Sequence, residues 1–412
     1  MSPRKALVLA LLAAASARAG GDATTLFDSR PFVRDGGHQD NSIYEAFSLN
    51  ARADGTDWLQ DVRIVARGWG RLTIGTSFDE HTTAGDVDSF FLEGRVLKRH
   101  LLLRVGRQLT TGGAMRATQV DGITADGVIA RGIGLQAWAG VPVQPRFAQA
   151  GGDFITGGRA FWRQAFDSEV GVSYVYALRK GYLSRSDLGV DGSWTPVRPV
   201  TVSGLLQWNL AESGRLAEAR LQALWQVDRK VQLVADVQRT EPDLFIDRSS
   251  IFAVFSEELR SEAGGEVVYR PLQPLSLEAD YHWLKVEGGH GYRTGARATY
   301  RTPYGGSYGA ELRLLDQPDN GYTLARVFGI RKLKHDITVT LDLDAYWLQN
   351  EINATKHSFV GTLTGGWAFL PNWEAMLAGS LGTTPYFERR SELIARVVYR
   401  FGIPAGLPGG FR

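Results

Sequence analysis

Apolar and polar residues alternate along most of this chain, and the segment from Ile337 to Gln349 shows the pattern most clearly. Successive side chains of an extended strand point to opposite faces, so alternation predicts a strand with one apolar and one polar face. The apolar face holds Ile337, Val339, Leu341, Leu343, Ala345 and Trp347. The polar face holds Thr338, Thr340, Asp342 and Asp344.

The same pattern closes the chain, in the segment from Ser391 to Phe401. One side of this strand carries Leu393, Ala395, Val397, Tyr399 and Phe401, and the other includes Glu392, Arg396 and Arg400. The pattern recurs from residue 41 onwards at the spacing of a transmembrane β-barrel. We therefore interpret residues 391–401 as the strand that closes a barrel and residues 402–412 as a C-terminal tail.

Two kinds of connection separate the predicted strands. One kind is two to four residues long and often contains proline or basic residues. The other is longer and polar, at Asp79–Asp86, Gln144–Thr156 and Glu241–Leu259. Outer-membrane barrels have short periplasmic turns and longer outer loops. The prediction is an all-β chain with one domain, an antiparallel up-and-down transmembrane β-barrel over residues 41–401. We count about 22 strands, an even number between 16 and 22.

A short motif supports this class. Leu103-Arg104-Val105-Gly106-Arg107-Gln108 is followed by Asp121-Gly122, which indicates a strand ending in Gly-Arg-Gln, a loop, and Asp-Gly opening the next strand. This run resembles porin-like outer-membrane families, including alginate-export-type barrels. The closing strand likewise resembles the C-terminal strand of Gram-negative outer-membrane proteins. The resemblance implies an outer-membrane barrel and suggests polysaccharide export.

The N-terminus has the features of a secretory signal peptide over Met1–Ala19. Arg4 and Lys5 precede an apolar stretch, and Ala17-Arg18-Ala19 forms a small-x-small cleavage site. A single-pass anchor is the alternative, but the segment is short for a membrane span. We expect a mature chain from Gly20, a periplasmic N-terminal arm over residues 20–40, and a place in the bacterial outer membrane. The expected partners are outer-membrane lipid and the barrel-assembly machinery.

Composition narrows the chemistry. The chain has no cysteine, which excludes a disulfide framework and thiolate metal sites. A formal net charge of +2 gives no support for a nucleic-acid partner. The seven histidines show no metal-ligand spacing, and no nucleophile-elbow, zinc-protease or phosphate-loop motif occurs. We expect no cofactor and no enzyme; an outer-membrane hydrolase would need a serine near a histidine and an acid in the folded barrel.

The polar faces of the predicted strands should line the lumen. Their basic residues are Arg63, Arg67, Arg95, Arg104, Arg220, Arg293, Arg297, Arg301, Arg313, Arg396 and Arg400. Their acidic residues are Asp61, Glu93, Glu218, Asp236, Glu262, Glu266, Glu278, Asp280, Glu311, Asp342, Asp344 and Glu392. These charges either pair across strands and brace the wall, or they create a transverse field across opposite walls that orients solutes. The second reading rests on an arginine ladder at 293, 297 and 301 beside an acidic sector at 262, 266, 278 and 280.

The longest connection, Glu241–Leu259, is unusually apolar for an outer loop. We predict that it folds into the barrel mouth as a constriction loop; folding over the rim or contact with a partner are the alternatives. The apolar residues proposed to form the constriction are Phe245, Ile251, Phe252 and Phe255.

The function predicted from sequence is a water-filled outer-membrane channel that works passively. Two substrate classes compete, small hydrophilic solutes and an exported polysaccharide, and a polymer exporter is often gated or needs a periplasmic polysaccharide-export partner. A structural or adhesion barrel with a closed lumen is a different class of function. A soluble all-β protein is the remaining alternative, and it would not fractionate with membranes.

Overall fold

The computed structural model describes residues 18–31, 39–56, 58–75, 83–130, 132–144, 149–150, 152–164, 168–211, 214–241, 259–286, 288–318, 320–385 and 387–402. The first strands are β1 (Arg18–Pro31), β2 (Gln39–Gly55), β3 (Gln60–Gly75), β4 (Thr83–Val96), β5 (Leu101–Gly112), β6 (Met115–Ala130), β7 (Ile133–Gln144), β8 (Gln149–Ala150), β9 (Phe154–Gln164), β10 (Ser168–Arg179), β11 (Tyr182–Val197) and β12 (Val200–Asn209). The rest are β13 (Arg215–Gln226), β14 (Val231–Thr240), β15 (Arg260–Leu272), β16 (Leu275–Val286), β17 (Gly289–Arg301), β18 (Ser307–Asp316), β19 (Tyr322–Lys332), a short 3-10 helix η4 (Lys334–Asp336), β20 (Ile337–Ile352), β21 (Thr355–Leu370), β22 (Trp373–Thr384) and β23 (Phe387–Gly402).

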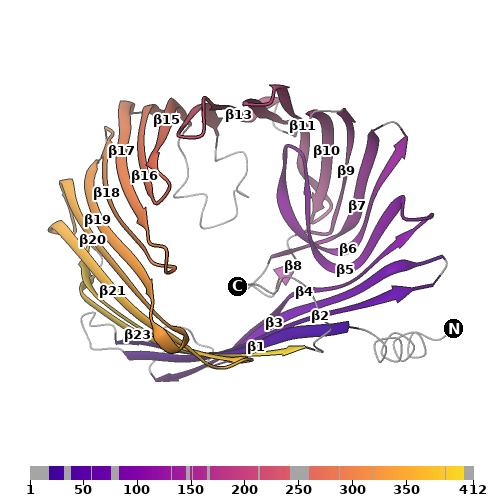
Figure 1. Ribbon diagram of the computed structural model, residues 1–412. Coiled ribbons are helices and arrows are strands. Elements are labelled where there is room, and N and C mark those ends of the chain that lie inside the picture. Colours follow the sequence, from indigo (N-terminus) through magenta and orange to yellow (C-terminus); the bar gives the residue numbers. More distant parts are fainter. Residues whose placement is uncertain are drawn as a thin grey trace.

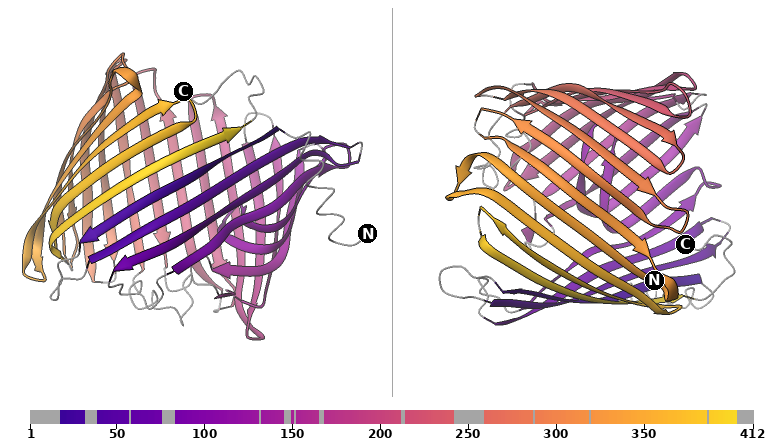
Figure 2. Two further views of the ribbon diagram at one scale, coloured as in Figure 1. Left: turned by 90° about the horizontal axis from the view of Figure 1, so that it is seen from below. Right: turned by 60° about the vertical axis from the view of Figure 1, so that its left-hand side comes forward.

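These strands close into a barrel (Figures 1 and 2). Each strand pairs antiparallel with the next, and β23 returns to pair with β1 from Gly20↔Gly402 to Ser29↔Leu393. The strand β8 is a two-residue pair beside β7, so the ring itself has 22 strands. Closure gives every strand two neighbours and removes the free sheet edge that an open sheet would expose. The predicted fold class, with its even strand number, is confirmed.

The predicted N-terminal arm is wrong over its first part. Residues 18–31 form β1, which pairs with β2 on one side and with β23 on the other. Pairing with β23 begins at Gly20, so cleavage after Ala19 would leave all of these pairs intact. Residues 32–38, the signal segment 1–17 and the tail from 403 lie outside the described residues. The signal peptide therefore stays a prediction.

The two edges of the barrel differ in the connections that they carry. The first residue of β1 and the last of β23 lie at the same edge, together with short turns such as 97–100, 227–230 and 273–274. The strands that flank the longer connections 145–153 and 241–259 end and begin at the opposite edge, which also carries two-residue turns such as 180–181 and 353–354. In the 227–230 turn, Asp228 accepts hydrogen bonds from the backbone N–H groups of Lys230 and Val231, which lower the pKa of its carboxyl. These local bonds hold the turn tight.

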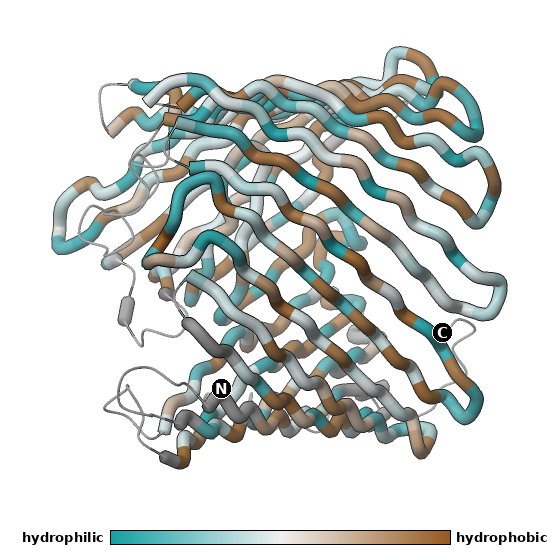
Figure 3. The backbone as a smooth tube through the Cα atoms, turned by 90° about the vertical axis from the view of Figure 1, so that its left-hand side faces the viewer, coloured by the Kyte–Doolittle hydropathy of each residue, from teal (hydrophilic) through white to brown (hydrophobic). Residues whose placement is uncertain are grey.

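The outer face of the wall is apolar. Large side chains at alternate positions, such as Leu312, Val327, Leu363 and Leu377, are more than half exposed. Apolar and polar positions alternate along the strands that face the viewer in Figure 3. Within the described residues, no helix has both the length and the apolar character to span a membrane. The exposed apolar positions give the wall the outer surface expected of a lipid-facing barrel.

We expect a charge on the outer face to impair assembly more than the same charge one residue away. Leu363 is 57% exposed near the middle of β21, whereas Thr362 points to the other face as the register partner of Asp342. Leu363→Arg should cost roughly 2–4 kcal/mol because the guanidinium would lie in lipid, and Thr362→Arg should be tolerated beside a carboxylate. Folded barrel is quantified by heat-modified gel mobility. Equal assembly of the two variants would contradict this orientation of the wall.

Candidate functional site

Side-chain alternation can be followed through the strand register around the whole ring. Partners in register share a face, and the series Arg396↔Leu26↔Tyr44↔Arg71 continues along β3 to Arg63. From there the pairs lead through β4–β23 back to the starting face. The register places all of the residues proposed to line the lumen on this one face. Those residues are Arg63, Arg67, Arg95, Arg104, Arg220, Glu262, Glu266, Glu278, Asp280, Arg293, Arg297, Arg301, Asp342, Asp344 and Arg396.

Some of these charges are paired across neighbouring strands. Glu93 of β4 accepts a hydrogen bond from Arg104 of β5 and lies 3.9 Å from Arg63 of β3. Arg63 also donates to Asn50 at 3.1 Å. Arg95 lies 3.7 Å from Asp61 near the edge that holds the termini. This part of the wall therefore carries more arginine than carboxylate.

The predicted acidic sector surrounds a histidine. His282 of β16 has a 7% exposed side chain and reaches across Gly264 to Asp236 of β14, with 3.0 Å between Nε2 and Oδ1. A Cβ at Gly264 would lie 2.6 Å from the imidazole, so the glycine makes this reach sterically possible. On the other side of the imidazole, Oδ2 of Asp280 lies 3.7 Å from Nδ1 of His282. Within the described residues, no group of three or more such side chains is arranged to hold a metal ion.

The arginine ladder lies on β17, directly beside the acidic sector of β15 and β16. The idea that these two sectors occupy opposite walls is therefore wrong, because they are neighbours in the sheet. Among the described residues no ion pair is formed by Arg293, Arg297 or Arg301. Arg297 instead stacks over the ring of Phe328, 4.7 Å from its centroid. The three arginines of the ladder therefore lie on the inner face without an acidic partner among the described residues.

Beyond the ladder, Arg326 of β19 gathers the two carboxylates proposed on β20. It donates to both oxygens of Asp342 and lies 3.5 Å from Asp344. A bidentate arginine–carboxylate pair is strong and geometrically specific. Sequence reasoning assigned the two aspartates to the lumen but missed Arg326, although it lies on the alternating polar face of its own strand.

The hairpin of β5 and β6 departs from a plain barrel because it leaves the wall. β4 pairs with β5 only as far as Phe90↔Arg107, although both strands continue beyond this point. The departure begins at Gly106, whose φ of +126° is a conformation that side chains rarely adopt. A Cβ at this position would also come 2.2 Å from the carbonyl oxygen of Phe90. Gly106 therefore acts as the hinge of the hairpin.

Where the hairpin departs, it leaves one edge of β4 without a neighbouring strand, and side chains donate hydrogen bonds to the backbone carbonyls of that edge. Arg107 donates to the backbone carbonyl of Val87 and to Asp86, each at 3.0 Å, and forms a bidentate pair with Asp121 at 2.8 and 2.9 Å. Gln119 donates to the carbonyl of Asp88. These bonds replace the backbone hydrogen bonds that β5 would have made if it had continued beside β4. The Gly-Arg-Gln and Asp-Gly motif thus forms the base of the hairpin.

The underside of the hairpin packs on the wall through a small apolar core. The core consists of Val120 from the hairpin and Trp138, Ile155, Val175 and Ala177 from β7, β9 and β10. All five side chains are at most 6% exposed. Their wall positions share the face that carries the charges. The hairpin therefore lies against the inner side of the barrel, over three neighbouring strands (Figure 1).

The tip of the hairpin reaches farther, to β11 and β13. The N–H of Ala114 donates to Asp191 at 3.2 Å, and Arg116 lies 3.6 Å from Glu218. Asp191 in turn pairs with Arg159, which is only 8% exposed and also bonds Glu169 at 2.7 Å. Removing one partner of such a buried pair leaves an uncompensated charge, which costs several kcal/mol. This network fixes the tip against the wall.

Sequence reasoning placed the constriction elsewhere. It read residues 109–120 as a loop, whereas they form strand on both sides of a two-residue turn at Gly113–Ala114, and this reading is wrong. The glycines around the motif were the available signal, because the register partners Gly106, Gly122 and Gly140 cross three strands at the bend. The apolar connection proposed as a constriction loop, with Phe245, Ile251, Phe252 and Phe255, lies outside the described residues.

Known proteins resemble this chain in fold. The translocation pore of the P pilus usher PapC is 10% identical with a TM-score of 0.52, over 93% of this chain and 100% of that chain. OccK7 (OpdD) of Pseudomonas aeruginosa is 12% identical with a TM-score of 0.48, over 94% and 100%. OpdQ of the same organism is 13% identical with a TM-score of 0.46, over 94% and 99%. No family model and no curated protein matches the chain. The likeness to the usher pore shows the closed-barrel fold.

We expect the hairpin tip to be trapped by an engineered disulfide, because the native chain has no cysteine to compete. A Cβ at Gly189 would lie 2.7 Å from that of Ala114, whereas a disulfide needs roughly 3.8 Å, so the tip must move back by about 1 Å to accept the bond. Ala114→Cys combined with Gly189→Cys should cross-link on mild oxidation and migrate faster in a denaturing non-reducing gel. Ala114→Cys with Gly366→Cys, on the inner face of β21, is the control and should not cross-link. Equal behaviour of the two pairs would show that the tip does not rest on β11.

Proposed function

We propose that this chain is an outer-membrane channel through which hydrophilic solutes diffuse passively, and that the β5–β6 hairpin sets its narrowest passage. The observation that carries the proposal is the inner face of a closed 22-strand ring, which holds a carboxylate sector and arginines that have no acidic partner among the described residues. A ring of this size encloses more space than wall side chains can fill. Charges there need water, which a solute path supplies. Export through a signal peptide and insertion by the barrel-assembly machinery complete the proposal.

The placement of charge supports a transverse field within the passage. In a ring of 22 strands, the wall that faces β15 and β16 lies about half the ring away, at β3–β5. This wall carries Arg63, Arg67, Arg95 and Arg104 on its inner face, in excess over their acidic partners Glu93 and Asp61, and it lies opposite Glu262, Glu266, Glu278 and Asp280. Fields between oppositely charged walls orient polar solutes and favour those with hydrogen-bonding groups. The proposal therefore concerns polar and charged small molecules rather than apolar ones.

Export of a polysaccharide is the second candidate. On the basic side of the wall, the rings of Tyr44 and Trp69 lie 6.3 Å apart on the inner face, and Arg67 shares that face. Aromatic rings beside cationic groups can carry a sugar polymer by stacking and charge. A polymer exporter would work with a periplasmic partner, so pull-down of such a partner together with low conductance of the isolated barrel would favour export over diffusion.

Removing the hairpin tip should widen the channel. Deleting residues 111–117 and joining Thr110 to Thr118 through Asn-Gly would preserve their register pair and form a tight two-residue turn. The contacts of Ala114 and Arg116 with the far wall would be lost. We expect single-channel conductance in planar bilayers to rise by about twofold or more relative to the wild type. Unchanged conductance would place the constriction elsewhere, and a wild-type barrel that conducts in neither form would favour a closed structural barrel.

Neutralising the ladder should change ion selectivity. Arg293→Gln, Arg297→Gln and Arg301→Gln together would leave the neighbouring carboxylates unbalanced, so the reversal potential in a salt gradient should move toward cation preference. The shift should be largest at low salt because the screening length is then longest. The matched variant Glu262→Gln, Glu266→Gln and Glu278→Gln should move it toward anion preference. A conducting barrel whose selectivity responds to neither variant would show that these charges do not face the solute path.

A further inference from the structure

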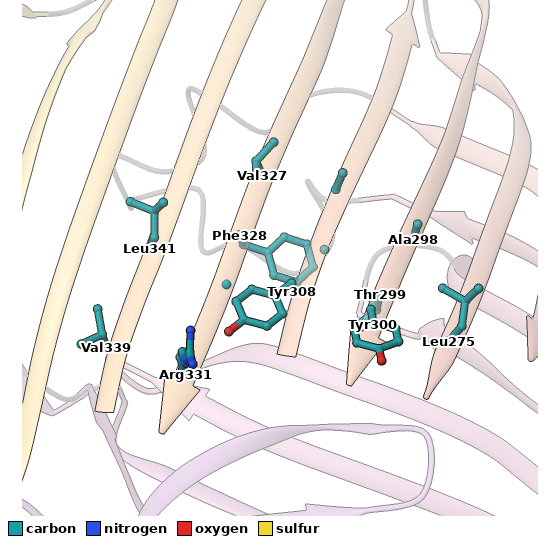
Figure 4. A pocket seen from close by; sticks show the side chains of 13 residues that line it. Leu275, Ala298, Thr299, Tyr300, Tyr308, Val327, Phe328, Arg331, Val339 and Leu341 are labelled. Carbon is teal, nitrogen blue, oxygen red and sulfur yellow. The ribbon is translucent and has the colours of Figure 1, made fainter. Parts of the chain in front are cut away.

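The outer surface of the barrel has a groove near the edge that carries the termini. It has a volume of about 470 Å³ and crosses β16–β20. Its floor is formed by Ala298 and Ala310, which are register partners on neighbouring strands. One step nearer the edge, Tyr300 and Tyr308 are also partners and form one wall of the groove (Figure 4). Two methyl groups beside two large rings leave a hollow that an all-leucine surface would fill.

A cation lies at the end of this groove. Arg331, the penultimate residue of β19, lines the groove and is the register partner of Val339 on the outer face. Its side chain is exposed, and it has no hydrogen bond or ion pair with any residue that the structure describes. This contrasts with Arg326 of the same strand, which faces the interior and is paired with two aspartates. An outward-facing guanidinium beside lipid needs an anion or water within reach.

The position of the groove identifies the anion. Tyr300 and Tyr308 lie at strand ends next to the turn 302–306, the level at which aromatic side chains meet lipid headgroups. Toward the barrel middle the groove is walled by Val327 and Leu341, and its exposed surface is almost wholly apolar. From the edge of the barrel inward, the cation of Arg331 therefore comes first and the apolar hollow second. The phosphate and acyl chain of a membrane lipid follow one another in the same order.

We infer that this groove binds one phospholipid, with its phosphate on Arg331 and one acyl chain over Ala298 and Ala310. Arginine binds phosphate through two parallel N–H donors, which suits a fixed headgroup better than a point charge does. The acyl chain gains contact with the tyrosine rings and with apolar side chains on both flanks of the hollow. The site lies on the outside of the wall, so it is independent of the solute path proposed above.

Two substitutions test the two halves of this site. Arg331→Gln removes the charge, and Ala310→Leu fills the hollow with a side chain that is ordinary on the outer face. Each has a matched control on the outer face away from the groove. Arg239→Gln removes an exposed arginine near the other edge, and Ala137→Leu enlarges an exposed alanine of β7. All four barrels are first shown to be folded by heat-modified gel mobility.

The measurement is native mass spectrometry of detergent-purified barrel with dioleoyl phosphatidylglycerol added, and with dioleoylglycerol as the ligand that lacks phosphate. We expect the wild type and both controls to retain one phosphatidylglycerol in preference to dioleoylglycerol. Arg331→Gln should weaken retention by about fivefold, and Ala310→Leu should abolish it, while bilayer conductance stays at the wild-type value in both.

Three results would overturn the inference. The first is retention by Arg331→Gln and Ala310→Leu equal to that of their controls. The second is equal retention of the two lipids by the wild type, which would assign the groove to apolar contact without phosphate. The third is a wild-type dimer that Ala310→Leu converts to a monomer, which would make a second copy of the chain the occupant. None of these outcomes depends on whether the barrel conducts.

Discussion

The structure depends on one constraint: backbone N–H and C=O groups within a nonpolar membrane must be paired by the protein itself. Closure between β1 and β23 meets this constraint around the ring, because every strand then has a neighbour on each side. The hairpin of β5 and β6 breaks the rule locally when it leaves β4. Arg107 and Gln119 restore it by donating to carbonyls on the unpaired edge. The inward hairpin can exist because these two side chains act as substitutes for a strand.

The same hairpin gives the interior two different environments. Beneath it, an apolar core around Trp138 and a buried pair between Arg159 and Asp191 join the hairpin to the wall like the layers of a soluble domain. On the uncovered wall, Arg293 and Arg297 keep their charge without an acidic partner among the described residues. Charge is thus neutralised beneath the hairpin, whereas the uncovered wall holds both paired charges, such as Arg326 with Asp342, and arginines without an acidic partner among the described residues.

The outer face shows a comparable division. Most outward positions carry large apolar side chains, which suits a surface that meets many lipids without preference. Over β16–β20 this uniform surface is interrupted by the alanines and by Arg331, which has no partner in the part of the chain that the structure describes. Small side chains create shape, and a cation creates polarity, so this part of the surface has the two properties that selective binding requires.

The sequence by itself determined the strands, their two faces and the closed barrel, because alternation with period two is a local property that survives without knowledge of partners. It failed for β1, whose glycines and polar residues alternate weakly and become a strand only because β2 and β23 lie on either side. It also failed for the hairpin. Thr110 and Gln119 are polar and read as loop, yet they are buried, because the tertiary structure folds their strands against the wall. Which charges meet was decided only by register between strands, as the three-strand reach of His282 to Asp236 across Gly264 shows. Contacts of this kind join residues far apart in sequence, and no local pattern encodes them.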